Sequence, residues 1–152
     1  IGMFDGSTKQ VQDVEVGDVV KSYWPDNMSL SDMDYRDYTT TNLTGSFSGS
    51  IVVGISSDEI SDYYVLNGSK KLSKANSSHS DSDYFVKSGD TWSWKKVSDI
   101  STGDYLLQGD GTELEVTSLT EEAAETTFYS LDVEDIDTYF QSDILVHNIP
   151  KM

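Results

Sequence analysis

Two adjacent residues, His147 and Asn148, could together break a peptide bond. The side-chain amide nitrogen of an asparagine can attack its own main-chain carbonyl carbon, which closes a succinimide ring and releases the following residue. A neighbouring histidine can polarise that carbonyl group or protonate the leaving nitrogen. The apolar run Ile144–Val146 predicts a strand directly before the dyad, and a fixed backbone makes the attack a positioned, unimolecular event. Taken as a bare dipeptide, His-Asn also fits a strand that ends in a turn-favouring asparagine.

His79, the other histidine of the chain, lies three residues after Asn76 in a polar segment. A neutral imidazole can hold or protonate the nitrogen of a scissile peptide bond, and the nearby amide can donate and accept hydrogen bonds. The alternative is a surface histidine in a polar loop.

The composition excludes several other kinds of chemistry. The chain has 27 acidic and 10 basic residues, a net charge of −17, and no cysteine. This charge disfavours nucleic acids and anionic membrane surfaces as partners, and the absence of cysteine excludes disulfides, thiolate metal sites and a Cys nucleophile within these residues. No apolar run is long enough to cross a membrane. The acidity indicates a solubilising surface or, as the sharper alternative, a surface for a basic partner.

Aspartate pairs at Asp32-Met33-Asp34 and Asp81-Ser82-Asp83 raise the possibility of a metal site. Neither pair has the spacing or the glycine of a calcium-binding loop, so we expect no metal and no cofactor.

Short apolar alternations separated by turn residues predict an all-β fold in a single domain that covers residues 1–148. The segment 25–50 is rich in Asp, Ser, Thr and Gly and is predicted to be a loop insertion. Val97–Ile100 is predicted to form a short helical turn, and a short helix is also possible at Thr120–Glu125. The predicted strands are Val11–Val16, Val19–Tyr23, Ile51–Ile55, Tyr63–Leu66, Tyr84–Lys87, Trp92–Trp94, Tyr105–Leu107, Leu114–Val116 and Phe128–Val133.

One motif occurs twice. Val14-Glu15-Val16-Gly17-Asp18 and Ile100-Ser101-Thr102-Gly103-Asp104 each run from an apolar residue to Gly-Asp and then into a strand. The repetition predicts two structurally similar halves, although Gly-Asp pairs are common in β proteins.

Together these motifs resemble the Hint superfamily, which includes inteins, bacterial intein-like domains and hedgehog autoprocessing domains. The resemblance implies a horseshoe of short strands with halves related by a pseudo-two-fold axis. It also implies autocatalytic, single-turnover rearrangement of peptide bonds without a cofactor. The matching segments, in the family's order, are Asp5–Asp18, Asn76–His79, Trp94–Leu107, Phe128–Phe140 and Ile144–Asn148.

The resemblance also implies a role for each site residue. Asn148 would cyclise with the help of His147. His79 would act at the N-terminal junction, beside Asn76 in the place of the family's threonine. Asp137 falls where many members have a histidine that assists cyclisation, and Ser130 falls where some members have an aspartate that assists the first step.

The family's N-terminal nucleophile, a Cys or Ser, would precede Ile1 by a short stretch, so we expect another segment to supply it. The partner would be a short N-terminal intein fragment, as in an atypically split intein. The alternatives are an N-terminally truncated bacterial or phage domain that cleaves without splicing, and an engineered inactive form.

Residues 149–152 resemble flanking extein sequence. Splicing needs Cys, Ser or Thr directly after the terminal asparagine, and Ile149 stands there, so cleavage is expected and ligation is not. A rival interpretation is an inert acidic module with a structural or binding role. The location expected from the family is the cytoplasm of a bacterial or phage-infected host.

Overall fold

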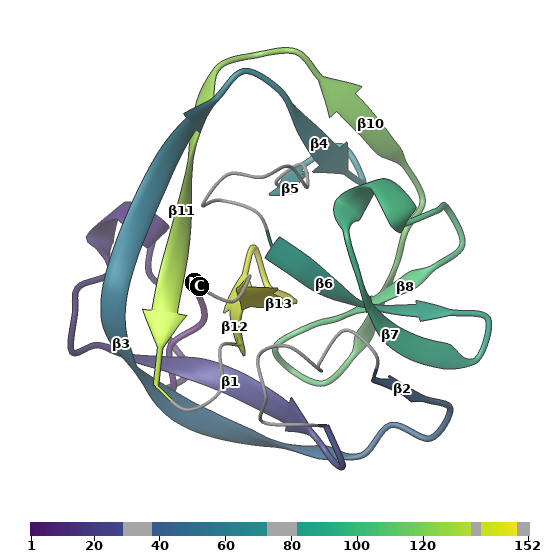
Figure 1. Cartoon of the computed structure of the whole chain (residues 1–152), viewed down its shortest axis with the longest axis horizontal. Helices are drawn as coiled ribbons and strands as arrows, with labels where there is room; N and C mark the ends of the chain where they lie inside the picture. Colours follow the sequence, from purple (N-terminus) through teal and green to yellow (C-terminus); the bar gives the residue numbers. More distant parts are fainter. Residues whose placement is uncertain (29–37, 73–81, 135–137, 149–152) are drawn as a thin grey trace.

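Antiparallel β-strands dominate the computed structural model, which describes residues 1–28, 38–72, 82–134 and 138–148 (Figure 1). Two 3₁₀ helices, η1 (Val11–Asp13) and η3 (Val97–Asp99), complete the regular elements of this part of the chain. The all-β fold class is therefore confirmed. The strands are β1 (Val19–Pro25), β2 (Thr39–Thr40), β3 (Gly45–Ile60), β4 (Tyr63–Leu66), β5 (Lys70–Leu72), β6 (Ser82–Ser88), β7 (Thr91–Lys95), β8 (Tyr105–Leu107), β9 (Glu113–Glu115), β10 (Leu119–Glu122), β11 (Thr126–Val133), β12 (Thr138–Gln141) and β13 (Ile144–Asn148).

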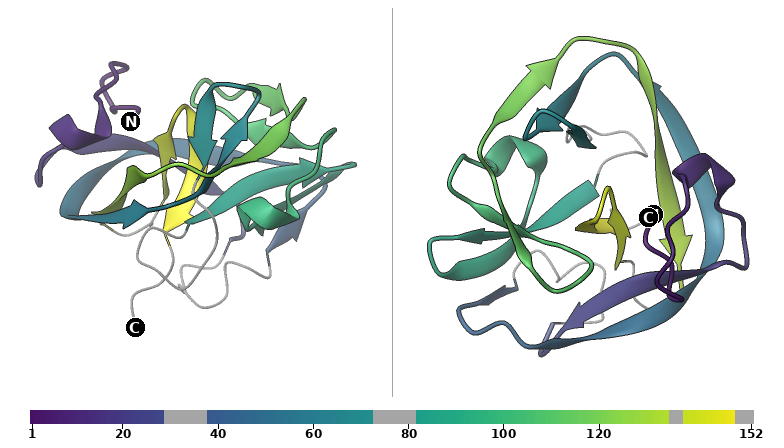
Figure 2. Two further views of the ribbon diagram at one scale, coloured as in Figure 1. Left: turned by 90° about the horizontal axis from the view of Figure 1, so that it is seen from above. Right: turned by 180° about the vertical axis from the view of Figure 1, so that it is seen from behind.

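The strand β3 organises the outer wall of the molecule. Its first part pairs with β1 and its second part with β11, both antiparallel, with a register shift between Asp132 and Val133. The wall curves around the short hairpin of β12 and β13, which lies in the middle of the fold from the front and from behind (Figures 1 and 2). This arrangement encloses the C-terminal strand on several sides.

The strand β13 lies between β12 and β6 in the largest sheet, whose order is β12-β13-β6-β7-β2. Alternate residues of a strand face opposite sides, so this sheet contributes to two separate cores. On one side, Tyr84, Val86 and Val146 join the main aliphatic core. The other side forms a cluster that we call the aromatic core, made of Tyr23, Met28, Phe85, Trp92, Trp94, Leu107, Phe140 and Leu145.

The repeated Gly-Asp motif adopts the same structure in both places. A 3₁₀ helix, η1 or η3, directly precedes each copy, and the glycine of each copy has positive φ, 99° at Gly17 and 92° at Gly103. Each glycine N–H donates to a backbone carbonyl, that of Val52 in β3 or that of Val116 directly after β9. These matching bonds support the prediction of two related halves.

The aspartates of the two motifs also match. Asp18 Oδ2 accepts a hydrogen bond from the Glu15 amide at 2.9 Å, and Asp104 Oδ2 accepts one from the Ser101 amide at 2.9 Å. The carboxylate therefore closes the turn that returns the chain to β1 or β8, which is the usual role of Asp in such turns.

Four local predictions have clear outcomes. The strand predicted at Val11–Val16 is wrong, because Val11–Asp13 form the 3₁₀ helix η1. The helical turn at Val97–Ile100 is confirmed as η3. The possible helix at Thr120–Glu125 is wrong, because residues 119–122 form β10 against β4. The predicted loop 25–50 extends too far, because Gly45–Ser50 belongs to β3 and pairs with β1; residues 29–37 lie outside the described part. Among the described residues, no helix is long and apolar enough to span a membrane.

Candidate functional site

A tight hairpin fixes the position of His147. Gln141 pairs with Ile144 across a two-residue turn, and the turn residues Ser142 and Asp143 both have positive φ, 52° and 63°. Positive φ at both central residues is the pattern of a type I′ hairpin turn, whose twist matches that of the strands it joins. The Lys70 ammonium donates to the Ser142 carbonyl at 2.6 Å, and Asp143 Oδ1 accepts from the Gly109 amide at 3.1 Å. The register that places Thr138 opposite His147 follows from this anchored turn.

His147 is almost completely buried, with 3% of its surface exposed. It lies opposite Thr138 of β12 on one side and opposite Asp83 of β6 on the other. Directly opposed residues of antiparallel strands share a face of the sheet, with Cβ atoms roughly 4.5–5.5 Å apart. Both neighbours are also buried, with exposures of 0% for Thr138 and 2% for Asp83. The imidazole therefore lies in a row of three buried polar side chains.

The Thr138 hydroxyl donates its hydrogen bond to β1 and not to His147. It donates to the Tyr23 carbonyl at 2.9 Å, while the Ser22 hydroxyl donates to the Thr138 carbonyl at 2.8 Å. These two bonds join β12 to β1 across the interior. They hold the strand beside His147 in place.

Trp94 closes the site from the side of the aromatic core. Its ring meets the His147 imidazole edge to face, with a centroid distance of 5.3 Å and an interplanar angle of 83°. The indole N–H donates to the Met28 sulfur at 3.0 Å, and Phe85 packs against Trp94 at 4.8 Å. An aromatic wall of this kind excludes water and lowers the local dielectric, so charges near His147 act more strongly than at the surface.

Only some of the predicted site residues lie in the part of the chain that the structure describes. His147 and the backbone of Asn148 lie at the end of β13, with Asn148 opposite Ser82 of β6. Ser130 lies on β11, in a different sheet, where it is buried and opposite Ser56. His79, Asn76 and Asp137 lie outside the described residues, so their predicted roles stay predictions.

Asp83, Trp94 and Thr138 border His147, although no sequence motif assigns them to the site. Asp83 was considered only in a possible metal-binding pair, and the described residues contain no group of three His, Cys, Asp or Glu side chains that could hold a metal ion. A signal for Asp83 does exist, because it directly precedes the apolar run Tyr84–Val86. An acidic residue at the start of a buried strand needs a partner.

A first hairpin, residues 1–9, lies beside the site's own hairpin. The Gly2 amide donates to the Phe140 carbonyl at 3.1 Å and the Lys21 amide donates to the Gly2 carbonyl at 2.9 Å, so this segment bridges β12 and β1. A hollow of about 200 Å³ lies here, bounded in part by Lys21, Gly109 and Asp143. The start of the described chain is thus hydrogen-bonded to the strand that neighbours β13.

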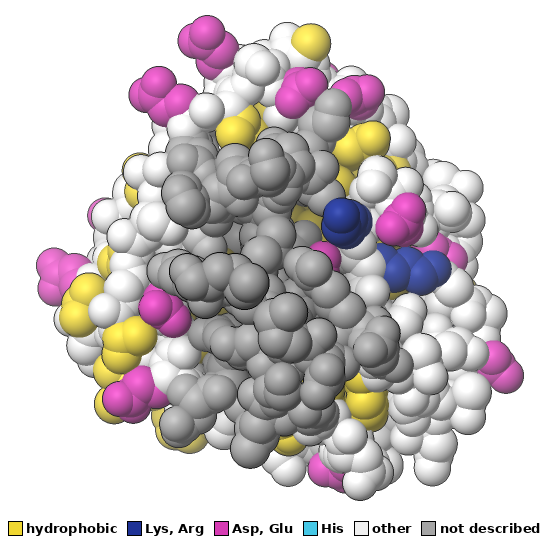
Figure 3. Space-filling view, in the orientation of Figure 1, with side chains coloured by type: hydrophobic (Ala, Val, Ile, Leu, Met, Phe, Trp, Pro, Cys, Tyr) yellow, Lys and Arg dark blue, Asp and Glu magenta, His cyan; other side chains and the backbone are white. Residues whose placement is uncertain are grey.

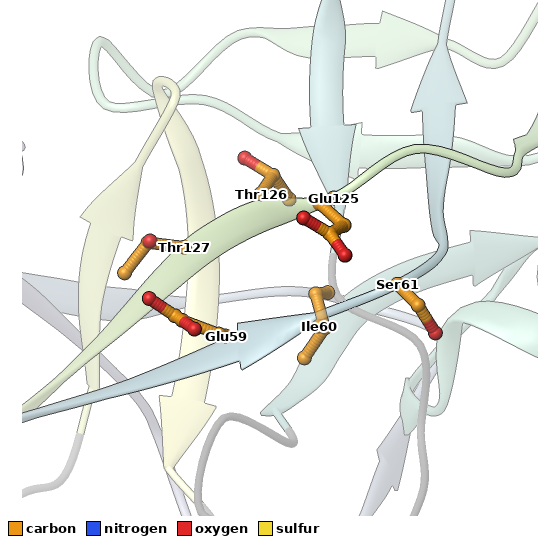
Figure 4. Close-up of a pocket in the computed structure, with 6 residues that line it drawn as sticks. All are labelled: Glu59, Ile60, Ser61, Glu125, Thr126 and Thr127. Atoms are coloured by element: carbon orange, nitrogen blue, oxygen red, sulfur yellow. The ribbon is translucent and has the colours of Figure 1, made fainter.

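A larger pocket, about 450 Å³, lies at the junction of β3 and β11 and is lined by residues 59–61 and 125–127 (Figure 4). Its two carboxylates are those of Glu59, on β3, and Glu125, directly before β11, and none of the site residues lines it. Acidic side chains are also scattered around the visible described surface (Figure 3). This pocket belongs to the outer wall and not to the site at His147.

The chain's fold is similar to that of three solved structures. A bacterial intein-like domain from Clostridium thermocellum is 19% identical, with 97% of this chain and 93% of that chain covered and a TM-score of 0.66. A DnaB intein from Synechocystis sp. PCC 6803 is 14% identical, with coverages of 94% and 88% and a TM-score of 0.59. The Ssp DnaB mini-intein variant M86 is 12% identical, with coverages of 97% and 88% and a TM-score of 0.51.

No protein-family model and no curated protein matches the chain. At these identities the likeness concerns the fold, and it covers nearly the whole chain. The protein therefore has the all-β Hint fold that the motifs predicted, shared with inteins and a bacterial intein-like domain.

Proposed function

We propose that this protein is a self-processing domain in which Asn148 cyclises and cleaves the Asn148–Ile149 bond. The observation that carries the proposal is the placement of His147. It is a nearly fully buried histidine, fixed by strands on both sides, and the residue directly after it is an asparagine at the end of the same strand. The intein fold supports the same interpretation independently.

The proposed reaction is a cyclisation that displaces the following residue from the Asn148 carbonyl carbon. The Asn148 side-chain nitrogen attacks the Asn148 carbonyl carbon and loses one proton, and the carbon–nitrogen bond to Ile149 breaks. The departing nitrogen gains one proton and becomes a free amine, while Asn148 becomes a C-terminal succinimide. His147 assists by polarising the carbonyl or donating the proton, a contribution typically of about 10²- to 10⁴-fold for a positioned acid–base group.

The fold supplies positioning for this reaction. The antiparallel neighbours β12 and β6 hold the backbone of β13 from both sides, up to Thr138 opposite His147 and Ser82 opposite Asn148. Restricting the backbone in this way lowers the entropy that the ring closure must lose.

We also propose roles for residues in the N-terminal half of a splicing reaction. His79, with Asn76 beside it, would act on the N-terminal scissile bond, and Ser130 and Asp137 would assist the two steps. We place the nucleophile on a short N-terminal segment, attached or separate, that continues the first hairpin next to Phe140 and Lys21. The hollow bounded by Lys21, Gly109 and Asp143 supports this place for it.

The residue after Asn148 sets the expected outcome. Ile149 carries no hydroxyl or thiol, so it cannot accept an acyl group from the N-terminal flank. The proposed activity is therefore cleavage at Asn148–Ile149, and replacement of Ile149 by Ser or Cys would be needed for ligation.

A second candidate function is an inert acidic module that keeps the fold without the reaction. The net charge of −17 and the isoleucine after Asn148 favour it. Incubation of the intact chain at neutral pH distinguishes the two. Time-dependent loss of the segment after Asn148, measured by mass spectrometry and absent from an Asn148→Ala variant, supports self-processing. A constant mass in a folded sample supports the inert module.

A further inference from the structure

Asp83 is the acidic residue that the fold brings directly opposite His147. The two residues are Cα partners in the antiparallel pairing of β6 with β13, and the two side chains are 2% and 3% exposed. Asp83 shares its strand face with Phe85, and His147 shares its face with Leu145, both members of the aromatic core. The carboxyl and imidazole groups therefore enter the same dry environment from adjacent strands.

Thr138 and Trp94, the other described residues that face His147, carry no charge. Thr138, opposite on β12, is uncharged and its hydroxyl donates to the Tyr23 carbonyl. Trp94, packed from β7, presents an uncharged ring. Lys95, the next residue of β7, lies on the opposite face of the strand, and its ammonium group donates to the Ser88 hydroxyl at 2.8 Å. Within the part of the chain that the structure describes, Asp83 is the titratable group that faces His147 across a strand pair.

A buried carboxylate is unfavourable unless a hydrogen-bond donor or a cation compensates its charge. A histidine at the directly opposed position can provide both, because its protonated ring donates from both nitrogens. A carboxylate in turn favours the imidazolium form and fixes which ring nitrogen faces it. The two groups are thus chemically matched as well as adjacent.

We infer that Asp83 is a positioning residue that orients the His147 ring and favours its protonated form. This inference rests on the proposed function for its kinetic consequence. An oriented imidazolium would deliver a proton to the departing nitrogen of Ile149, or a hydrogen bond to the Asn148 carbonyl oxygen. In this role Asp83 acts on the reaction through His147.

The test uses Asp83→Asn, which keeps the shape of the side chain and removes its charge. The matched control is Asp104→Asn, which changes another buried carboxylate, one that closes the turn at Ser101. Two quantities are measured at neutral pH: the first-order rate of cleavage after Asn148, and the ¹⁵N resonances of the His147 ring as a function of pH. The resonances are recorded in an Asn148→Ala background, so that the sample stays intact.

We expect Asp83→Asn to slow cleavage about 10- to 100-fold, less than the loss of a direct proton-transfer group. We also expect the His147 titration midpoint to move to lower pH, while Asp104→Asn leaves that midpoint unchanged. Should Asp83→Asn fail to fold, Asp83→Glu keeps the charge and displaces it by one methylene, and is expected to shift the ring resonances while retaining part of the rate.

An unchanged His147 titration midpoint in a folded Asp83→Asn protein, or unchanged His147 ring resonances in a folded Asp83→Glu protein, overturns the inference. The resonance measurement does not require any cleavage. A parent protein that never cleaves would contradict the proposed function. The ring resonances would still show whether Asp83 controls the protonation of His147.

Discussion

His147 and Asp83 lie directly opposite each other on β13 and β6, and both are nearly inaccessible to solvent. The two residues are far apart in sequence, and the pairing of β6 with β13 brings them together. His147 is the residue directly before the asparagine that the proposed reaction consumes.

Replacement of His147 tests its part in that reaction. His147→Gln keeps a polar side chain of similar size but removes the titratable group, so we expect cleavage to slow by about 10²- to 10⁴-fold. The rate is measured by intact mass, with near-ultraviolet circular dichroism reporting the packing around Trp94. A rate within twofold of the parent, in a folded variant, would contradict a role for His147 in proton transfer.

The repeated turns predict a matched pair of stability effects. Gly17 and Gly103 have φ values of 99° and 92°, where an added Cβ is strained whatever the free space. Gly17→Ala and Gly103→Ala should each lower the free energy of unfolding by about 1–2 kcal/mol. Gly2→Ala is the control, because a Cβ there meets its nearest described neighbour at an ordinary 3.6 Å. Urea denaturation measures all three, and a large effect at only one of the two turns would argue against their equivalence.

Tyr139 links the central hairpin to the outer wall. Its hydroxyl oxygen accepts a hydrogen bond from the Leu131 amide at 3.2 Å, and both residues are fully buried. Tyr139→Phe leaves that amide without this acceptor, so we expect a loss of about 1–3 kcal/mol in the free energy of unfolding. Tyr105→Phe, at a half-buried ring on β8, should change it by less than about 0.5 kcal/mol. Equal stabilities for the two variants would show that the Tyr139 bond contributes nothing.

Asp18 predicts part of the acid sensitivity of the fold. The hydrogen bond from the Glu15 amide, and then the Lys9 ammonium at 2.9 Å, hold the pKa of Asp18 below its ordinary value of 3.8. A carboxyl group with a lowered folded-state pKa contributes stability above its unfolded-state pKa, and this contribution disappears as the pH falls through the folded-state value. Asp18→Asn should therefore be less stable than the parent at pH 7 and should lose less stability on acidification below pH 3.8. Thermal unfolding from pH 7 to pH 2 measures both curves, and parallel curves would contradict the prediction.

Much of the fold could be predicted because its signals are local. Period-two alternation identified most of the strands, and the two Gly-Asp motifs indicated the related halves that the structure displays at Gly17 and Gly103. The first part of β3 was missed because residues 45–50 are mostly Gly and Ser and carry no apolar alternation. Their strand conformation comes from pairing with β1, which no local pattern encodes.

The site was predictable only where its residues are neighbours in sequence. His147 and Asn148 stand side by side in the chain, so their joint chemistry could be inferred directly. Asp83, Trp94 and Thr138 reach His147 through the register of three different strands, and such register depends on hairpin geometry and distant packing.

The central claim is that Asn148 cleaves the chain, and the mass of the protein over time tests it most directly. The intact chain and its Asn148→Ala variant are incubated at neutral pH, alone and with a synthetic peptide that begins with Cys or Ser and carries an apolar first strand. We predict loss of residues 149–152 from the parent, a succinimide or its hydrolysis product at position 148, and no change in Asn148→Ala. Cleavage that appears only with the peptide would support the proposed partner segment. A constant mass under both conditions, in a protein shown by circular dichroism to be folded, would contradict the account.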